Sequence, residues 1–386
     1  MMPVSATTNP EIAATTPLGG AVTVGDLPVR PSFRVRRPYD APQLSCPVRL
    51  NTNENPFSPS RALIEDVTAS VRAAAASMHR YPDREALQLR TELAEYITRY
   101  DGVRTNAENV WAANGSLETM RQLLDVFGGP GRSALSFAPS YSMYEIITVG
   151  AETGWLDGGR AADLSIDVDR AVSEISSTRP DIVFLARPDN PSGHCISLAE
   201  LEHILESASG VVIVDEAYRE YSEQPSAVGL IDRFPATLVV TRTMSKAFGF
   251  AGGRLGYLVA SPAVVGAVRS VSLPYHLSIL TQAAAMALLR HSGEVLSRIK
   301  EISAERERVA RALGEMGFDS VRSEANFLLF GHFQDAARAW EFYLEHGVLV
   351  RDPGVPHHLR TSIGLAEENT RFLEVTKNLA HSLPCR

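Results

Sequence analysis

The sequence predicts an α/β protein, with a large domain built on a mostly parallel sheet between helices and a smaller α+β domain after it. Short, almost continuously apolar segments alternate with segments of helical periodicity, which is typical of parallel strands covered on both faces. The length of 386 residues fits about two domains. We expect a flexible N-terminal extension (residues 1–30), a segment associated with the small domain (31–57), the large domain (58–273) and the small C-terminal domain (274–386).

The large domain is predicted to begin with helices. Apolar residues from Leu63 to Met78 repeat at helical spacing behind Ser60, whose hydroxyl suits an N-cap. A second helix is expected from Asp83, and a third follows the apolar segment 110–113. The later strands, most with helices between them, are predicted at Ala134–Phe137, Ile182–Ala186, Val211–Val214, Leu238–Thr241 and Leu255–Ala260. One intervening helix opens with the capping box formed by Ser197 and Glu200.

The pattern changes after about Leu273. A long helical stretch, with apolar residues from Ile299 to Leu313 and interleaved charges, leads to Gly317. Strands are then predicted at 326–330, 348–351 and 359–363, with helices from about residue 335 and over about 367–379. This mixture of elements indicates the smaller α+β domain.

Composition excludes several classes of protein. With 37 basic and 45 acidic side chains the formal net charge is −8, which argues against nucleic-acid binding through a general positive field. Three cysteines without a CxxC pair predict neither a disulfide framework nor a metal site. The longest apolar runs are strand-sized, so no membrane span is expected. The first 25 residues, rich in Thr, Ala and Pro, lack the pattern of a secretion signal, and we expect a cytoplasmic enzyme.

Polar residues gather in the loops that follow the predicted strands, where open parallel sheets bind ligands. Taken singly, each loop has an ordinary explanation, such as a turn at Asn190-Pro191 or a solvated Lys246. Together they predict one ligand-binding site. It is formed by the segments Asn114-Gly115-Ser116, Pro139-Ser140-Tyr141, Asp189–Gly193, Asp215–Tyr218, Thr243–Lys246 and Gly252-Gly253-Arg254.

The combined pattern fits an aldehyde cofactor that carries a phosphate, which implies pyridoxal 5′-phosphate. The Lys246 amine would condense with the aldehyde to a Schiff base. The Asp215 carboxylate would pair with the pyridine nitrogen and keep it protonated. Asn190 and Tyr218 would bond to the phenolic oxygen, and Tyr141 would stack on the ring. The phosphate would be held by the helix N-terminus together with Ser116, Ser245 and Arg254.

These residues lie in motifs that identify a family. After residue 30 the chain resembles the fold-type-I pyridoxal-phosphate-dependent aminotransferases over nearly its whole length, and within them most closely the histidinol-phosphate aminotransferase family. The resemblance rests on Leu50-Asn51-Thr52-Asn53-Glu54-Asn55-Pro56, Arg80-Tyr81-Pro82-Asp83, Pro38-Tyr39, Thr241–Phe248, Leu273–Ser278 and Leu359-Arg360.

The resemblance assigns further roles. Lys246, Asp215, Asn190 and Tyr218 take the cofactor roles already described, and Gly115, Ser116 and Leu117 form the phosphate loop. Tyr81 would reach the cofactor phosphate of the neighbouring subunit, which implies a homodimer. The substrate-binding residues implied are Tyr39, Asn53, Arg351 and Arg360.

Two segments depart from the family pattern. Leu117 stands where relatives commonly have an acidic or amide residue, and we expect little loss because that position mainly supplies a backbone N–H. The segment from Arg187 through Asp189 to Gly193 replaces a more usual Asn-Asn-Pro-Thr-Gly. Asp189 keeps the turn chemistry, whereas Arg187 has no assigned role.

The resemblance implies a ping-pong transfer through Lys246 that interconverts histidinol phosphate and imidazole acetol phosphate, with glutamate and 2-oxoglutarate as the other pair. Arg351 and Tyr39 favour a phosphate over a carboxylate, since a phosphate suits more than one cationic donor, whereas Arg360 serves either substrate. The alternatives are an aromatic amino-acid aminotransferase, a decarboxylase of a phosphorylated amino acid, and a non-catalytic ligand-sensing module on the same fold.

Overall fold

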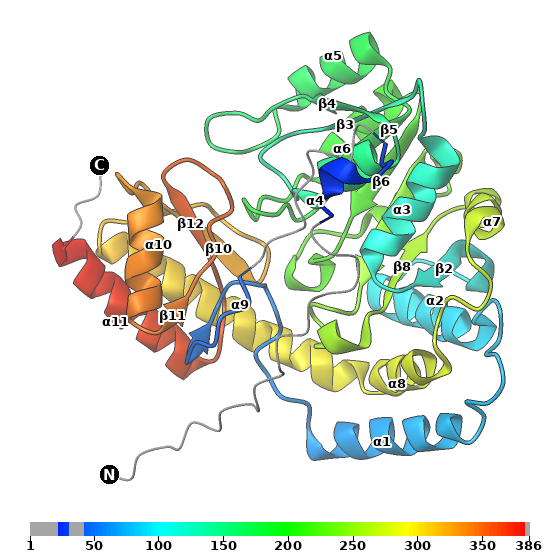
Figure 1. Cartoon of the computed structure of the whole chain (residues 1–386), viewed down its shortest axis with the longest axis horizontal. Coiled ribbons are helices and arrows are strands. Elements are labelled where there is room, and N and C mark those ends of the chain that lie inside the picture. Colours follow the sequence, from blue (N-terminus) through cyan, green and yellow to red (C-terminus); the bar gives the residue numbers. More distant parts are fainter. Residues whose placement is uncertain (1–21, 31–41, 383–386) are drawn as a thin grey trace. The chain divides into compact units, whose positions relative to one another are not determined.

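The computed structural model describes residues 22–30 and 42–382, so Tyr39 lies outside the described residues. The chain divides into two units, residues 1–41 and 42–386. In the first unit the described part is a short 3-10 helix, η1 (Val24–Asp26). The second unit carries all the other elements described below (Figure 1).

A seven-stranded sheet forms the centre of the second unit as far as it is described, in the order β2-β8-β7-β6-β5-β3-β4. The strands are β2 (Val110–Ala113), β3 (Ser133–Ser136), β4 (Gly154–Asp157), β5 (Ile182–Ala186), β6 (Val211–Asp215), β7 (Leu238–Thr243) and β8 (Gly256–Val259). β8 runs antiparallel to both of its neighbours, and the other pairs are parallel. The mostly parallel α/β fold predicted from the sequence is confirmed.

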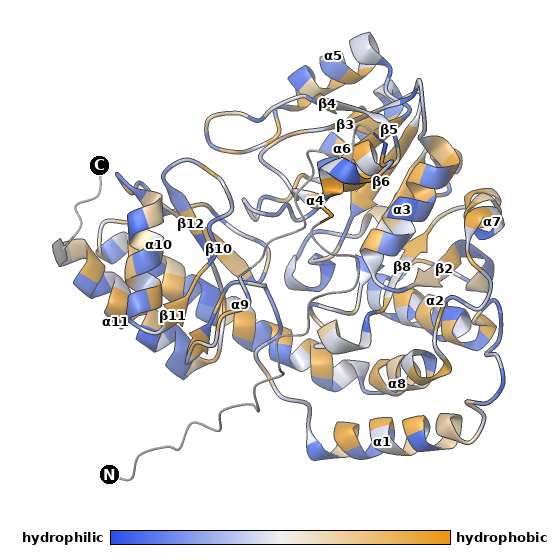
Figure 2. Ribbon diagram, in the orientation of Figure 1, coloured by the Kyte–Doolittle hydropathy of each residue, from blue (hydrophilic) through white to orange (hydrophobic). Residues whose placement is uncertain are grey.

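Helices cover both faces of this sheet because its side chains alternate between two apolar clusters. In β6, Val212 and Val214 join one cluster while Val211 and Ile213 join the other. Buried residues of α1 (Arg61–Ala75), α2 (Leu87–Asp101), α5 (Val168–Thr178), α6 (Leu198–Ser207) and α8 (Ile279–Arg290) belong to the first cluster. Those of α3 (Ser116–Phe127), α4 (Met143–Gly150) and α7 (Pro262–Val271) belong to the second. Figure 2 shows hydrophobic and hydrophilic residues alternating along these helices.

The predicted helix caps are present, with one shifted boundary. Ser60 accepts a hydrogen bond from the Leu63 N–H, and Ser197 forms the predicted capping box with Glu200. The helix expected from Asp83 begins only at Leu87, because the Asp83 carboxylate accepts the Leu87 N–H and holds the preceding turn. Short 3-10 helices connect larger elements at η3 (Ala107–Asn109), η4 (Arg219–Tyr221), η5 (Ala227–Leu230) and η6 (Ala251–Gly253).

The C-terminal elements begin with the long helix α9 (Ser292–Glu315). They continue through β9 (Asp319–Ser320), β10 (Phe327–Gly331), α10 (Ala336–Glu345), β11 (Val348–Leu349), β12 (His358–Ser362) and α11 (Ala366–Ser382). β10 pairs antiparallel with both β9 and β12, and β1 (Val48–Arg49) pairs parallel with β11. The chain just after residue 42 is thereby fixed beside the C-terminal elements, while the domain boundaries at residues 57 and 273 stay predictions.

None of the helices within residues 22–30 and 42–382 combines the length and the apolar character that a membrane span requires.

Candidate active site

The loops after the central strands bring most of the predicted site residues together. Asp215 ends β6, Asn190 lies four residues after β5, and Lys246 lies three residues after β7. Ser116 begins α3 directly after the loop from β2. The parallel strands therefore deliver these side chains to their carboxyl-terminal edge, where such sheets bind ligands.

Lys246 lies at the centre of this cluster. Its Nζ donates a hydrogen bond to the Thr52 carbonyl oxygen over 2.8 Å and lies 5.9 Å from the centre of the Tyr218 ring. Burial of the amine, with the positive charges of Arg360 and Arg254, lowers its pKa to about 8, against the opposing effects of Glu54 and Asp215. A substantial fraction of the amine is therefore neutral near physiological pH and able to act as a nucleophile or base.

Asp215 lies in a buried, hydrogen-bonded setting. Burial raises the pKa of its carboxyl group to about 6, although hydrogen bonds from Tyr144, Ala217 and Thr241 act in the opposite direction. The Tyr144 hydroxyl donates to Oδ2 over 2.8 Å, and the Ala217 N–H donates to Oδ1 over 3.1 Å. Such a carboxylate, with one oxygen held by a phenol, suits a cationic ring N–H as its partner.

The start of α3 forms an anion-binding site with Arg254. Gly115, the N-cap of α3, has a φ of 91°, and a Cβ there would lie 2.7 Å from Nη2 of Arg254. Arg254 Nη1 donates to the Ser245 hydroxyl over 3.2 Å. A guanidinium, a hydroxyl and a helix N-terminus that converge in this way fit a phosphate group. The Leu117 side chain packs against the second apolar cluster.

Asn53, which belongs to the motif Leu50–Pro56, also contacts the candidate site. Its Nδ2 donates to the Tyr218 hydroxyl over 3.0 Å, and its Oδ1 accepts from Ser362 over 2.9 Å. Asn53 adopts a φ of 56°, a left-handed conformation that asparagine tolerates better than most residues. The Asn326 side chain supports this turn by donating to the Asn53 carbonyl.

Arg360, in β12, contacts Asn190 and pairs with Arg351. Arg360 Nη1 donates to Asn190 Oδ1 over 2.5 Å, and its Nη2 donates to the Asn51 carbonyl over 2.9 Å. Arg351 and Arg360 form an antiparallel β-bridge through both backbone hydrogen bonds. Residues opposite each other in such a bridge project to the same side, so the two arginine side chains leave the backbone on one face. This arrangement can receive a multiply charged anion.

Two tyrosines occupy different settings. The Tyr141 ring meets the Tyr144 ring edge-on at 5.4 Å. Tyr81 is 80% exposed and stacks on Tyr275 with ring centres 4.5 Å apart, so it belongs to the surface of this chain. In the described ranges, no group of three His, Cys, Asp or Glu residues is arranged to hold a metal ion.

Sequence reasoning missed several partners in this site. The sequence leaves Tyr144 equally open to a core, a dimer-contact or a ligand-contact role, and in the structure its hydroxyl bonds to Asp215. Asn51 and Ser362 contribute through contacts with residues about 300 positions away, and no local pattern signals such contacts. The position of Tyr144, one helical turn after Tyr141 and directly behind a site loop, was the available signal for its role.

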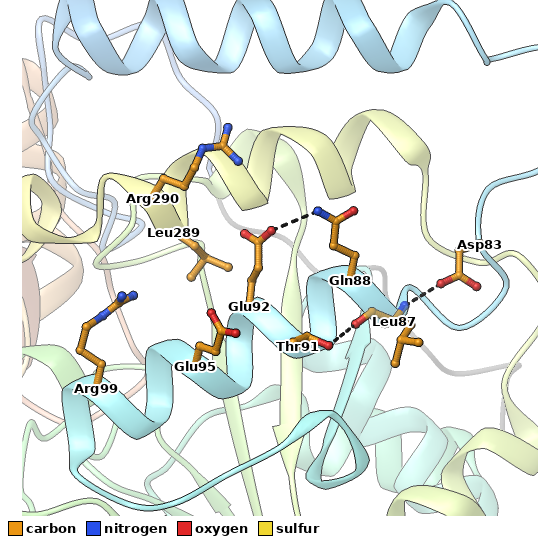
Figure 3. Close-up of a pocket in the computed structure, with 9 residues that line it drawn as sticks. All are labelled: Asp83, Leu87, Gln88, Thr91, Glu92, Glu95, Arg99, Leu289 and Arg290. Atoms are coloured by element: carbon orange, nitrogen blue, oxygen red, sulfur yellow. Dashed lines mark hydrogen bonds between the residues drawn. The ribbon is translucent and has the colours of Figure 1, made fainter.

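One cavity among the described residues lies away from this site. It has a volume of about 740 Å³ and is lined by Asp83, Leu87, Gln88, Thr91, Glu92, Glu95, Arg99, Leu289 and Arg290. Figure 3 shows the side chains of Gln88, Glu92 and Glu95 on α2 directed toward α8, with Gln88 bonded to Glu92. None of the candidate site residues lines it, and acidic and basic groups are mixed along its walls.

Comparisons with known proteins agree with this chemistry. The family described as aminotransferase class I and II matches residues 47–375. The histidinol-phosphate aminotransferase of Nocardia farcinica is 58% identical over 369 residues, which cover 96% of each chain. That of Mycobacterium avium is 58% identical over 93% of this chain and 90% of its own.

Solved structures share the fold. A putative aminotransferase from Burkholderia pseudomallei superposes with a TM-score of 0.75 at 29% identity, over 87% of this chain and 99% of its own. The histidinol-phosphate aminotransferase of Sinorhizobium meliloti, solved in complex with pyridoxal-5′-phosphate, has a TM-score of 0.78 at 24% identity, over 87% and 92% of the two chains.

Proposed function

The chain belongs to the histidinol-phosphate aminotransferase family of the class I and II aminotransferases, and on this premise we propose that it transfers an amino group between histidinol phosphate and 2-oxoglutarate in histidine biosynthesis. It is a pyridoxal-phosphate-dependent enzyme. In the biosynthetic direction, glutamate would donate the amino group to imidazole acetol phosphate. The observation that carries the substrate assignment is the 58% identity to the Nocardia farcinica enzyme over 96% of both chains.

The site residues fit the cofactor. Arg254, Ser245 and the N-terminus of α3 would bind its phosphate, since they converge on a space that a Cβ at Gly115 would enter. Asp215 would hold the ring N–H, Asn190 and Tyr218 would bond to the phenolic oxygen, and Tyr141 would lie against the ring. When bound, pyridoxal 5′-phosphate supplies an aldehyde that takes up amino groups and a ring that withdraws electrons from the neighbouring carbon.

Lys246 would act as both the anchor and the base. With a pKa of about 8, its Nζ is partly neutral near physiological pH and could accept the proton from the substrate carbon and return it to the carbon that comes from the cofactor's aldehyde. Asp215, ionised above about pH 6, keeps a positive charge on the ring nitrogen. The Tyr144 hydroxyl holds that carboxylate in its orientation through a 2.8 Å hydrogen bond.

The two arginines of the β-bridge would bind the substrate phosphate. Arg351 and Arg360 project from the same face, and Arg360 also contacts Asn190, so the substrate anion would lie next to the cofactor ring. A phosphate dianion gains more from two guanidinium groups than a single carboxylate does. Tyr39, outside the described residues, would assist from the N-terminal segment, and Asn53 would line the substrate side of the site.

The enzyme would work as a cytoplasmic homodimer in which Tyr81 reaches the cofactor phosphate of the partner subunit. Tyr81 is 80% exposed, and Leu273, two residues before its stacking partner Tyr275, is 73% exposed. Aromatic and aliphatic side chains with this exposure favour burial against another protein surface. Sedimentation analysis tests this arrangement, and a monomer with full activity would exclude it.

A half-reaction distinguishes the candidate substrates. The purified holoenzyme is mixed with histidinol phosphate or with phenylalanine, and the absorbance change of the bound cofactor is followed without an oxo-acid acceptor. We expect the phosphorylated substrate to react at much lower concentration. Comparable reaction with phenylalanine would favour an aromatic aminotransferase, and a colourless protein would point to a non-catalytic relative. Carbon dioxide released from a phosphorylated amino acid, tested as a third substrate, would indicate a decarboxylase.

A further inference from the structure

Two charged residues, at positions 187 and 189, closely precede Asn190 in its loop. Arg187 and Asp189 are each only 1% exposed. Burying a charge carries a large penalty unless a partner offsets it, and a buried pair seldom adds net stability over apolar packing. The partners of these two residues therefore indicate what they contribute.

Arg187 joins the loop to the end of β6. Its backbone N–H donates to the Asp215 carbonyl over 2.8 Å. Its guanidinium donates to the Ile196 carbonyl over 2.8 Å and to the Pro225 carbonyl over 2.7 Å, and it lies 3.4 Å from the Glu216 carboxylate. Glu216 directly follows Asp215, so the position of Arg187 is tied to that of the carboxylate proposed to hold the ring nitrogen.

Asp189 joins the loop to the segment that carries Tyr141. Its Oδ1 lies 2.7 Å from Nη2 of Arg160 and accepts the Ser140 hydroxyl over 2.8 Å, while Oδ2 accepts the Ser192 hydroxyl over 2.6 Å. The side chains of Arg160 and Asp189 are both 2% exposed. Arg160 is itself fixed, because its other nitrogens donate to two backbone carbonyls.

We infer that Arg187 and Asp189 are positioning residues that fix Asn190 relative to Asp215 and Tyr141 through two buried ion pairs, Arg187 with Glu216 and Asp189 with Arg160. The inference rests on the proposed function, in which Asn190 bonds to the phenolic oxygen of the cofactor. A hydrogen bond of this kind requires the amide to be held within a narrow range of distance and angle. Ion pairs and hydroxyl contacts specify such a position more strictly than apolar packing does.

The test uses the holoenzyme of three single variants. Asp189→Asn and Arg187→Met each break one ion pair, and Asp125→Asn serves as the control because it makes the same chemical change in an exposed pair with Arg121 on α3. Two quantities are measured: the pH midpoint of the absorbance change of the bound cofactor, and the dissociation constant of pyridoxal 5′-phosphate from the apoprotein. We expect the midpoint to shift by about half a pH unit, a threefold change in proton affinity, and the dissociation constant to rise severalfold in the first two variants alone.

A double-mutant cycle shows whether the effect passes through Asn190. Asn190→Ala should shift the midpoint by about one pH unit or more, because a hydrogen bond to a charged oxygen changes proton affinity tenfold or more. If Asp189 acts by placing Asn190, then Asp189→Asn adds no further shift in the Asn190→Ala background. A full additive shift in the double variant would overturn the inference, as would variants that lower the melting temperature but leave the midpoint unchanged.

If a single variant does not fold, a double variant that replaces both charges of one ion pair by neutral side chains still tests the inference. Asp189→Asn combined with Arg160→Gln removes both buried charges and leaves amides able to bond with each other. We expect this combination to recover most of the melting temperature while the midpoint stays shifted. Recovery of both quantities to wild-type values would refute a specific requirement for the ion pair. A wild-type protein without any cofactor absorbance would instead refute the proposed function.

Discussion

The hydroxyl of Tyr144 offers the most direct test of how the site controls Asp215. Tyr144→Phe removes the 2.8 Å hydrogen bond to Oδ2 and retains the ring, which is stacked 4.9 Å from Phe184. A hydrogen bond to a charged group contributes about 1.5–3 kcal/mol, and about 1.4 kcal/mol corresponds to one pKa unit. The bond lowers the pKa of Asp215, so its loss should raise that pKa from about 6 by about one to two units.

The change should appear in cofactor binding and in stability. At about pH 7 the ionised fraction of Asp215 falls roughly two- to tenfold, so the apoprotein should bind pyridoxal 5′-phosphate more weakly by a similar factor. The deficit should disappear by about pH 9, where the carboxyl group is ionised in both proteins. Because the pKa in the folded state lies above the unfolded value, ionisation of Asp215 costs stability at alkaline pH. The variant apoprotein should therefore lose about 1.5–3 kcal/mol of unfolding free energy there and less below about pH 6.

Fluorescence titration of the apoprotein with cofactor at several pH values measures the first effect, and urea unfolding measures the second. The matched control is Tyr221→Phe, since the Tyr221 hydroxyl is buried without a hydrogen-bond partner among the described residues. That variant should keep the wild-type pH profile. An unchanged affinity of Tyr144→Phe at neutral pH would refute the reasoning.

The remaining predictions concern the lysine and the two arginines. Lys246→Ala removes the anchoring amine and should abolish turnover; borohydride reduction and peptide mapping should label residue 246 in the wild type, and a label elsewhere would contradict the assignment. Because burial lowers the pKa of Lys246 to about 8, stopped-flow capture of the cofactor by the apoprotein should accelerate with pH and level off above about pH 8; a rate still rising steeply above about pH 10 would contradict this. Arg351→Ala and Arg360→Ala should each raise the KM for histidinol phosphate about tenfold or more, because each removes a charge-assisted hydrogen bond, and an unchanged KM for Arg351→Ala would leave the phosphate to Arg360 alone.

The sequence predicted the buried strands of the central sheet well, because a short, continuous apolar run between helices indicates a strand that is buried on both faces. Val211–Val214 and Ile182–Ala186 match β6 and β5 closely, since all their residues are buried. β4 (Gly154–Asp157) was missed because it is an edge strand, half exposed and without an apolar run. A run of apolar residues in the sequence indicates that a segment is buried. It therefore does not reveal strands at the edge of a sheet, which are partly exposed.

The site was predictable to the extent that its residues follow strands. Asp215, Asn190 and Lys246 were found from this rule together with the family motifs, and the structure places them at one edge of the sheet. Contacts between distant segments were not predictable, because the fold brings them together. The Thr52 carbonyl that accepts Lys246 is 194 residues away along the chain. The ion pair between Arg187 and Glu216 likewise emerges only from the pairing of β5 with β6.

The cofactor-facing Asp215 and the buried ion pair of Glu216 with Arg242 lie on opposite faces of the sheet, and the register of β6 and β7 determines this separation. Asp215 pairs with Thr241, and this pair faces Tyr144 and the cofactor side. One residue further, Glu216 binds Arg242 with Nη2–Oε2 at 2.8 Å, and Arg242 also meets Asp101 at the end of α2, on the opposite side. Since side chains alternate along strands, a slip of one residue would exchange the two sets. The positively charged Arg242 would then face the ring nitrogen. Thr241 would take the place of Arg242 opposite Glu216, and the buried Glu216 carboxylate would lose its cationic partner. The Glu216–Arg242 pair therefore secures the register that gives Asp215 its role, because the wrong alignment would leave buried charges uncompensated.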